Sequence, residues 1–236
     1  MNPHPMPGLF ITGTDTGVGK TFIAAAIAAA LARKGRKIGV LKPVATGGEP
    51  IEDAEALLSA IGGGVPIGRI TPLHYPDPLA PCIAARLAGR PLRQADLMET
   101  VRRAIAWWAE RSSMMVVEGV GGLLCPLADD STVADLAIAL DYPMILVARR
   151  ALGTLNHTLL TVEAARDRGL RIAGIVLNGS TPTADPLAES TAPEELIRRL
   201  DGIPILAEIP HGDDPAAIID PIDWIGLSQP PRARSV

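Results

Sequence analysis

Aromatic residues and cysteines are scarce in this sequence. Only 3% of the 236 residues are Phe, Trp or Tyr, so the core must be built from aliphatic side chains, and a hydrophobic share of 47% is large enough for that. The two cysteines, Cys82 and Cys125, are too few for a disulfide framework or a cysteine-based metal cluster. We therefore expect two free thiols and a reducing, cytoplasmic location.

The chain also lacks a strong excess of charge and a long apolar run. It has 22 Lys and Arg against 26 Asp and Glu, a net charge of −4, which gives no electrostatic reason to expect nucleic acid or an anionic membrane. No basic segment followed by an apolar stretch opens the sequence, so we expect no signal peptide. The apolar segment 22–31 is too short to span a bilayer. Neither nucleic acid nor a membrane is an expected partner.

Short β-rich segments alternate with longer helical ones along the chain. We predict strands at 9–12, 37–41, 114–118, 144–147, 172–177 and 205–209, and helices at 20–34, 53–61, 80–87, 93–111, 133–140, 154–168 and 193–200. Apolar runs such as 145–147 are typical of parallel strands buried on both faces. The alternation predicts an α/β fold with a doubly wound, mostly parallel sheet flanked by helices.

The length fits one domain, which we place at residues 1–225. The polar, proline-containing segment 226–236 is predicted to be a disordered tail. Four prolines within 70–81 indicate a rigid loop and not a linker between domains.

The segment Gly-Thr-Asp-Thr-Gly-Val-Gly-Lys-Thr at 13–21 is the most informative part of the chain. It lies between an apolar strand and an alanine-rich helix. When a strand, a glycine-rich loop and a helix follow one another, backbone N–H groups of the loop and the positive end of the helix dipole point at a bound phosphate. Lys20 would reach the β- and γ-phosphates, and the Thr21 hydroxyl would ligate Mg²⁺. The sequence therefore predicts a P-loop NTPase-like fold that binds a nucleoside triphosphate.

Two acids are possible partners for that metal ion. Glu118 ends a predicted strand and is followed by three glycines within four residues, as expected for the second half of a P-loop metal site. Asp53 opens a predicted helix, where it can stabilise the helix dipole or serve as a second acid near the metal. Lys42 follows the second predicted strand and can place a second positive charge across the phosphates, although most lysines are ordinary surface residues.

Three further segments follow predicted strands. Gly153 and Thr154 indicate a helix start with Thr154 as N-cap, whose free N–H groups can hold a carboxylate or simply be capped. Asn178 can present its amide to a purine edge or form a turn before Gly179. The segment 209–211 ends the last strand and can line a base pocket.

Together these segments resemble the dethiobiotin synthetase family. The matching stretches are GTDTGVGKT at 13–21, KPVATG at 42–47, VVEGVGGLLCPL at 116–127, LGTLNHTLLT at 152–161, GIVLN at 174–178 and EIP at 208–210. They occur in family order over residues 9–211, and the five residues between Gly13 and Gly19 are themselves typical of this family. Two positions depart from the family pattern, Gly17 where Glu is common and His211 where Trp is familiar.

The resemblance implies a ligase of biotin biosynthesis. It would carboxylate diaminopelargonate with CO₂ or bicarbonate and close the ring at the expense of ATP, with Mg²⁺ as cofactor. The family is also homodimeric, with the substrate site near the subunit interface.

The resemblance also implies a role for each matching residue. Lys20 and Lys42 would be catalytic, and Thr21, Asp53 and Glu118 would hold the metal. The implied nucleotide contacts are Gly17, Val18, Gly19, Lys20, Thr21, Phe22, Asp53, Glu118, Gly119, Val120, Gly121, Asn178, Ile209, Pro210 and His211. The implied substrate contacts are Thr16, Thr46, Gly153, Thr154, Leu155 and Asn156.

Two other functions remain as alternatives. One is an amidoligase of the cobyric-acid synthetase type, although this chain is too short for the usual glutaminase domain, and neither cysteine lies in a convincing nucleophile turn. The other is a nucleotide-switched ATPase that recruits a protein or membrane partner. Partitioning ATPases carry a signature lysine where this chain has Asp15, and no basic amphipathic tail is present, which disfavours that class.

Overall fold

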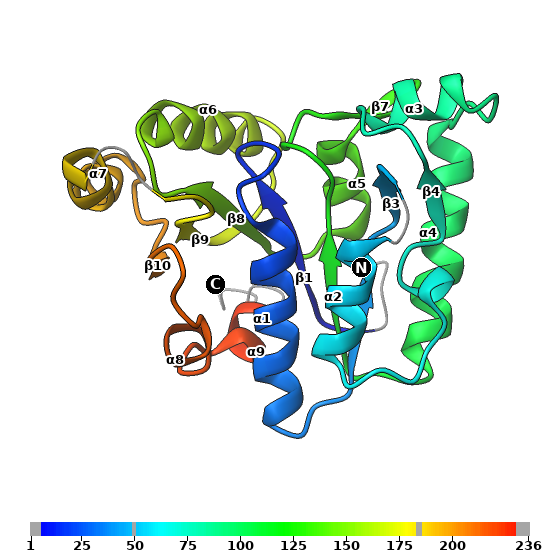
Figure 1. Cartoon of the computed structure of the whole chain (residues 1–236), viewed down its shortest axis with the longest axis horizontal. Coiled ribbons are helices and arrows are strands. Elements are labelled where there is room, and N and C mark those ends of the chain that lie inside the picture. Colours follow the sequence, from blue (N-terminus) through cyan, green and yellow to red (C-terminus); the bar gives the residue numbers. More distant parts are fainter. Residues whose placement is uncertain (1–5, 49–50, 183–185, 230–236) are drawn as a thin grey trace, which may run out of the picture.

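A six-stranded, fully parallel sheet forms the centre of the molecule. The computed structural model describes residues 6–48, 51–182 and 186–229 (Figure 1). The sheet has the order β10-β9-β8-β1-β5-β2, and two small two-stranded sheets, β3-β4 and β6-β7, lie outside it. The strands are β1 (Gly8–Gly13), β2 (Ile38–Leu41), β3 (Val44–Thr46), β4 (Leu73–Tyr75), β5 (Met114–Glu118), β6 (Pro126–Ala128), β7 (Ser131–Thr132), β8 (Met144–Arg149), β9 (Ile172–Asn178) and β10 (Ile205–Ile209).

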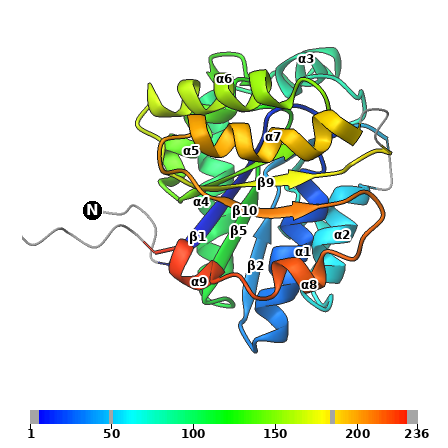
Figure 2. The same cartoon turned by 90° about the vertical axis from the view of Figure 1, so that its left-hand side faces the viewer.

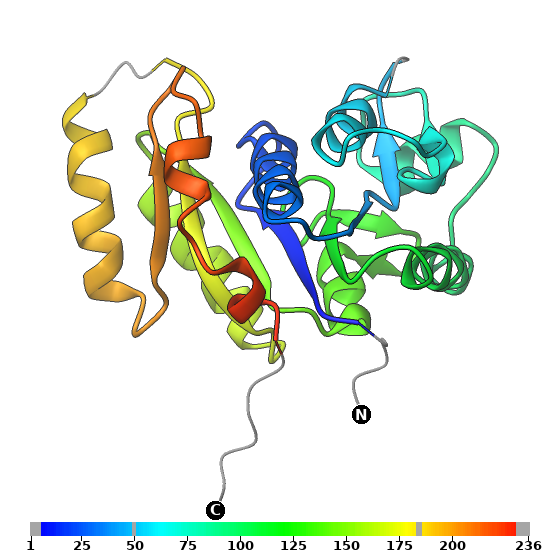
Figure 3. The ribbon, with the colours of Figure 1, turned by 90° about the horizontal axis from the view of Figure 1, so that it is seen from below.

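Helices cover both faces of this sheet. They are α1 (Lys20–Arg33), α2 (Glu52–Ala60), α3 (Pro81–Leu87), α4 (Gln94–Ala109), α5 (Val133–Leu140), α6 (Thr154–Arg166), α7 (Pro186–Arg199), α8 (Ala216–Ile219) and α9 (Trp224–Leu227), with a short 3₁₀ helix at Ile67–Arg69. Helices α1, α2 and α8 lie on one face, and α4, α5, α6 and α7 lie on the other (Figures 2 and 3). This three-layered arrangement confirms the predicted doubly wound α/β fold.

The strand order reverses at β1, which places a binding crevice there. From β1 the chain crosses to the edge strand β2 and returns to β5, whereas β8, β9 and β10 extend the sheet the other way. In open α/β sheets, ligands bind at the carboxyl ends of the strands beside such a reversal. The loop after β1 and the last residue of β5 therefore meet at one point.

The alanine-rich sequence of α1 explains how closely this helix packs on the sheet. Ile23, Ile27 and Leu31 recur at four-residue spacing and are fully buried, with Ala24 and Ala28 buried beside them. Burial of each large aliphatic side chain contributes about 1.5–3 kcal/mol, and the small alanines allow the helix axis to approach the strands. The position of α1 in turn fixes the helix start that follows the glycine loop.

The structure differs from the sequence prediction in several places, and the short antiparallel strands β6 and β7 are among the elements that were not predicted. The predicted loop 70–81 contains β4, which pairs in parallel with β3, and neither short strand was predicted. Helix α7 begins at Pro186 and runs through Pro193, so it is longer than the predicted helix 193–200. Within that added part, the hydroxyl of Thr191 donates to the Leu187 carbonyl at 2.8 Å.

The first residues of the predicted tail 226–236 belong to a helix. Gly226 lies within α9, whose first residue, Trp224, is buried, and Ser228 is buried as well. Residues 230–236 lie outside the described residues, so most of the predicted tail is not described.

Candidate functional site

The glycine loop connects β1 to α1 and is held in place by a residue from β9. Gly19, the N-cap of α1, has a φ of 93°, which favours glycine, and a Cβ there would lie 2.1 Å from Asn178 Nδ2. Asn178 is itself buried, and its Nδ2 donates to the Val18 carbonyl at 2.9 Å. The closely packed amide explains why only glycine fits at position 19.

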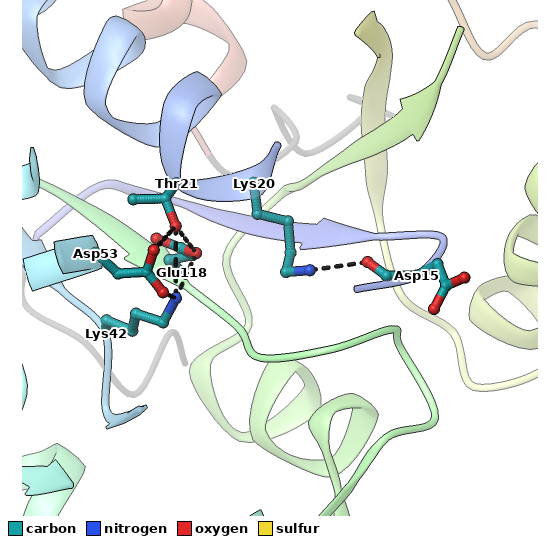
Figure 4. Close-up of polar contacts among 6 residues, drawn as sticks. All are labelled: Asp15, Lys20, Thr21, Lys42, Asp53 and Glu118. Atoms are coloured by element: carbon teal, nitrogen blue, oxygen red, sulfur yellow. Dashed lines mark hydrogen bonds and ion pairs between the residues drawn. The ribbon is translucent and has the colours of Figure 1, made fainter. Parts of the chain in front are cut away.

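Sheet register brings the acid of β5 to the same edge as this loop. Glu118 pairs with Ile11 of β1, so it stands at the carboxyl end of β5 directly beside the strand that leads into the loop. Lys42 follows β2, the neighbour of β5 on its other side. Asp53 is the second residue of α2, which packs against α1. Four separate elements therefore deliver polar side chains to one place (Figure 4).

Three oxygen atoms converge there in a way that fits Mg²⁺. The Thr21 hydroxyl lies 2.9 Å from Asp53 Oδ1 and 2.7 Å from Glu118 Oε1, yet it has only one proton to donate. Glu118 Oε2 is buried without a hydrogen-bond partner among the described residues. Hard oxygen ligands of this kind, completed by substrate phosphates, are what Mg²⁺ prefers. Among the described residues, no group of three or more His, Cys, Asp or Glu is placed to bind a metal.

Lys42 neutralises the two acids. Its side chain is almost fully buried, and Nζ lies 2.9 Å from Glu118 Oε1 and is ion-paired with Asp53 (Figure 4). Burial opposes the charge on Lys42, but the attraction of Glu118 and Asp53 outweighs it and raises the pKa of the ammonium. Burial also opposes the charge on Asp53, and there Lys42 outweighs it and lowers the pKa of the carboxyl. We conclude that the site holds a charged Lys42 paired with a charged Asp53.

Lys20 lies apart from that cluster. It points toward the other end of the glycine loop, where Nζ donates to the Asp15 carbonyl at 2.9 Å (Figure 4). Burial lowers the pKa of Lys20, and Lys42 adds to the effect, although Glu118 opposes it. The Asp15 carboxylate also lies 3.8 Å from Arg149 at the end of β8, an exposed pair that contributes little energy.

These side chains face one cavity of about 690 Å³ at the carboxyl ends of the strands. Of the residues singled out in the sequence, it is lined by Thr16, Gly17, Gly19, Lys20, Thr21, Phe22, Lys42, Thr46, Asp53, Glu118, Val120, Gly121, Asn178, Pro210 and His211. Sequence reasoning missed Gly179, Ser180, Gly212 and Asp213, which also line it. Their only signal was that they follow Asn178 or His211 directly.

The other predicted residues do not line this cavity. Val18, Gly119 and Ile209 are buried in the elements beneath it. Gly153, Thr154, Leu155 and Asn156 form the start of α6 instead, and there the predicted cap is wrong. Gly153, with a φ of 90°, is the N-cap, and Thr154 is the first helical residue, its hydroxyl 3.4 Å from that of Thr158. Glycine in the left-handed conformation ends the preceding turn without a side-chain cap.

The fold and the site define a P-loop nucleotide-binding protein. A family model described as an AAA domain matches residues 7–217. The ATP-dependent dethiobiotin synthetase BioD of Anaeromyxobacter dehalogenans (strain 2CP-C) is 48% identical over 89% of this chain and 92% of the relative. That of Bacillus subtilis (strain 168) is 41% identical over 87% of each chain. The chain belongs to the ATP-dependent dethiobiotin synthetase family, as the sequence motifs predicted.

Solved structures of other proteins share the fold. The chloroplast FtsY of Physcomitrella patens matches with a TM-score of 0.52 and 19% identity over 91% of this chain, which spans 60% of that protein. The signal recognition particle receptor FtsY of Elizabethkingia anophelis matches with a TM-score of 0.51 and 15% identity over 96% of this chain and 66% of that one. At this identity the likeness shows the fold alone.

Proposed function

We propose that this chain closes the ring of 7,8-diaminopelargonate with CO₂ and ATP, giving dethiobiotin, ADP and phosphate in biotin biosynthesis. In a chain of this family, the main support for the proposal is the cluster of polar side chains at the end of the P-loop cavity. It consists of Lys42, Thr21, Asp53 and Glu118. That arrangement matches a transfer of a phosphoryl group between anionic reactants, which needs positioning and charge neutralisation and no covalent enzyme intermediate.

The reaction would proceed in three steps: carbamate formation, phosphoryl transfer and ring closure. One amine of the diamine bonds to the carbon of CO₂ and loses a proton, giving a carbamate. A carbamate oxygen then attacks the γ-phosphorus of ATP, and the bond from that phosphorus to the bridging oxygen breaks, so that ADP leaves with both electrons. The second amine finally attacks the carbonyl carbon of the carbamic–phosphoric anhydride and loses a proton, and the bond from that carbon to the phosphate oxygen breaks, so that phosphate leaves as the cyclic urea closes.

The two lysines would neutralise the negative charge of the carbamate and of the phosphates during these steps. Lys42 stays an ammonium because Glu118 and Asp53 raise its pKa, and it stands at the catalytic end of the cavity, where it would neutralise the carbamate. Lys20 would turn from the Asp15 carbonyl to the β- and γ-phosphates, since the cavity lies open beside its buried chain. Both roles require positive charge held in a site of low dielectric constant.

Magnesium would be held by Thr21, Asp53 and Glu118. Bound there with the phosphates, it would neutralise the charge that develops on the transferred group. The buried, unpartnered oxygen of Glu118 supports this ligand set. The loop backbone from Gly17 to Gly19 and the residue Phe22 would contact the nucleotide, as would the segment from Glu118 to Gly121.

The diamine would lie at the catalytic end of the cavity, and its carboxylate would reach a second subunit. Thr16 and Thr46 line the cavity and would contact the amines or the carbamate. Residues from Gly153 to Asn156 lie outside this cavity, beside Leu152, which is 78% exposed. We therefore propose a homodimer in which the start of α6 completes the partner's substrate site. Leu152→Glu should shift the mass measured by light scattering from dimer to monomer.

Phosphate release tests the function. ATP turnover should require diaminopelargonate and bicarbonate together, and mass spectrometry should find dethiobiotin as the product. Hydrolysis that ignores the diamine would contradict the proposal and favour a nucleotide switch. Turnover that depends on glutamine would instead favour an amidoligase. Among the helices of the described residues, none has both the length and the apolar character that a membrane span requires.

A further inference from the structure

A second, smaller cavity of about 310 Å³ lies beside the main one. Thr46 and Asp53 line both cavities, so these two residues stand between them. Asp53 is held by its contacts with Lys42 and Thr21, whereas Thr46 is the last residue of β3, a strand of only three residues. With open space on two sides, Thr46 depends strongly on the hydrogen bonds of the backbone next to it.

The chain turns directly after Thr46. Gly47 has a φ of 118°, in the left-handed region that favours glycine. Its N–H donates to the Tyr75 carbonyl at 3.0 Å, which continues the pairing of β3 with β4 by one residue. Two strands of this length are only marginally stable by themselves, so contacts beyond the ladder matter at this turn.

His74, the middle residue of β4, supplies such a contact. Its Nε2 lies 2.7 Å from the Gly47 carbonyl, which can only accept, so Nε2 carries a proton and donates it. The residue is half-buried and lines the second cavity together with Thr46. Both polar backbone groups of Gly47 are therefore bound by neighbouring residues of β4, the N–H by Tyr75 and the carbonyl by His74.

The same stretch of chain also aligns Lys42. The Lys42 N–H donates to the Ile70 carbonyl at 2.8 Å, and the Leu73 N–H donates to the Pro43 carbonyl at 3.3 Å. Residues 42–47 therefore lie along residues 70–75. The backbone bond of Lys42 fastens one end of this segment, and the His74 side chain fastens the other end, beside Thr46.

We propose that His74 is a positioning residue for the diamine. By holding the Gly47 carbonyl, it fixes the turn after β3 and with it the place of Thr46 in the wall of the main cavity. The glycine loop and α1 belong to other elements, so the binding of the phosphates does not depend on His74. This inference rests on the proposed function, in which Thr46 contacts the amines or the carbamate, and adds a residue to it.

Steady-state kinetics of the full chain with diaminopelargonate, bicarbonate, ATP and Mg²⁺ test this role in two amide variants. His74→Gln places its amide nitrogen near the position of Nε2 and keeps the donor for Gly47. His74→Asn places its amide nitrogen near the position of Nδ1 and removes that donor. His74→Asn should raise the KM for the diamine about tenfold, as expected for one lost hydrogen bond, and leave the KM for ATP within about twofold. His74→Gln should keep both values within about threefold of the wild type.

Arg90→Met is the matched control for a general loosening of β4. The exposed Arg90 donates from Nη2 to the His74 carbonyl at 2.9 Å, and its guanidinium lies 4.9 Å from the centre of the Tyr75 ring, so it supports the strand itself. This variant should lower the thermal midpoint without raising the KM for the diamine.

An unchanged diamine KM in His74→Asn would overturn the inference, as would an equal rise in the KM for ATP or an equal rise in Arg90→Met. Amide hydrogen exchange at residues 44–48, measured without reactants, should be faster in His74→Asn than in the wild type and His74→Gln. Equal exchange in all three proteins would also overturn it. Wild-type ATP turnover that ignores the diamine would instead contradict the proposed function, and the exchange measurement would still test the contact between His74 and Gly47.

Discussion

Thr21 Oγ1 lies 2.7 Å from Glu118 Oε1, although 97 residues separate them in the sequence. The hydroxyl lies in the first turn of α1 and the carboxylate ends β5, so the contact joins the start of this helix to the end of that strand. Asp53 approaches the same hydroxyl at 2.9 Å, so the three oxygen atoms lie where the proposed Mg²⁺ ion would need its protein ligands.

Glu118→Gln should therefore raise the Mg²⁺ concentration needed for half-maximal turnover. The amide keeps the shape of the side chain but loses the charge that holds a divalent ion. We expect an increase of at least about tenfold. A titration of phosphate release against Mg²⁺ at saturating ATP measures it. An unchanged Mg²⁺ dependence would show that Glu118 does not ligate the metal.

Lys42→Met should reduce turnover by about 100- to 1000-fold while nucleotide binding stays largely intact. Methionine fills the buried space but removes the charge, and Glu118 loses its nearest cation. Loss of one partner of a buried pair also destabilises a protein, so the thermal midpoint must be measured alongside. Near-normal turnover in a folded variant would refute the assigned role of Lys42.

Asn178→Ala should loosen the glycine loop. The amide that donates to the Val18 carbonyl is buried, and its removal leaves that carbonyl without the partner shown here. We expect a loss of about 1–3 kcal/mol in the free energy of unfolding. Denaturant unfolding measures it, and amide hydrogen exchange should show faster exchange at residues 17–19. A variant as stable as the wild type, with unchanged exchange, would contradict this role.

The stability of α5 should depend on pH through Asp135. This carboxylate accepts from the Thr132 N–H and hydroxyl, both at 2.7 Å, and the backbone bond is the main reason why its pKa is lowered. A lowered folded-state pKa contributes stability above the unfolded-state value of about 4, and that stability is lost as the pH falls through the folded-state pKa.

Asp135→Ala should therefore cost about 1 kcal/mol at pH 7, and the difference from the wild type should shrink below about pH 4. Urea unfolding at a series of pH values measures this. Glu163→Ala, which removes an exposed carboxylate from the last turn of α6, is the control and should show no comparable trend. A pH-independent cost for Asp135→Ala would rule out the electrostatic part of the cap.

Most strands and helices can be predicted from the pattern of apolar residues within each segment. The elements that were missed depend on contacts with distant parts of the chain or on an unusual helix start. The six strands of the main sheet were all predicted because each is a nearly continuous apolar run. Strands β3 and β4 were not predicted, because each has only three residues and is stabilised by the other across a long stretch of chain. The start of α7 was missed because a proline inside a helix normally marks its beginning.

The sequence by itself determined the phosphate-binding loop, the family and the acids and lysines of the site, because these depend on residue types at fixed spacing. Only the tertiary structure decided that Asp53 faces Thr21 and Lys42 while also opening α2, since that requires α2 to pack on α1. Likewise, the contact of His211 Nδ1 with the Gly179 carbonyl at 2.9 Å forms only because β9 and β10 lie side by side. A hydrogen-bond partner is a property of two chain segments, and no spacing within one segment specifies it.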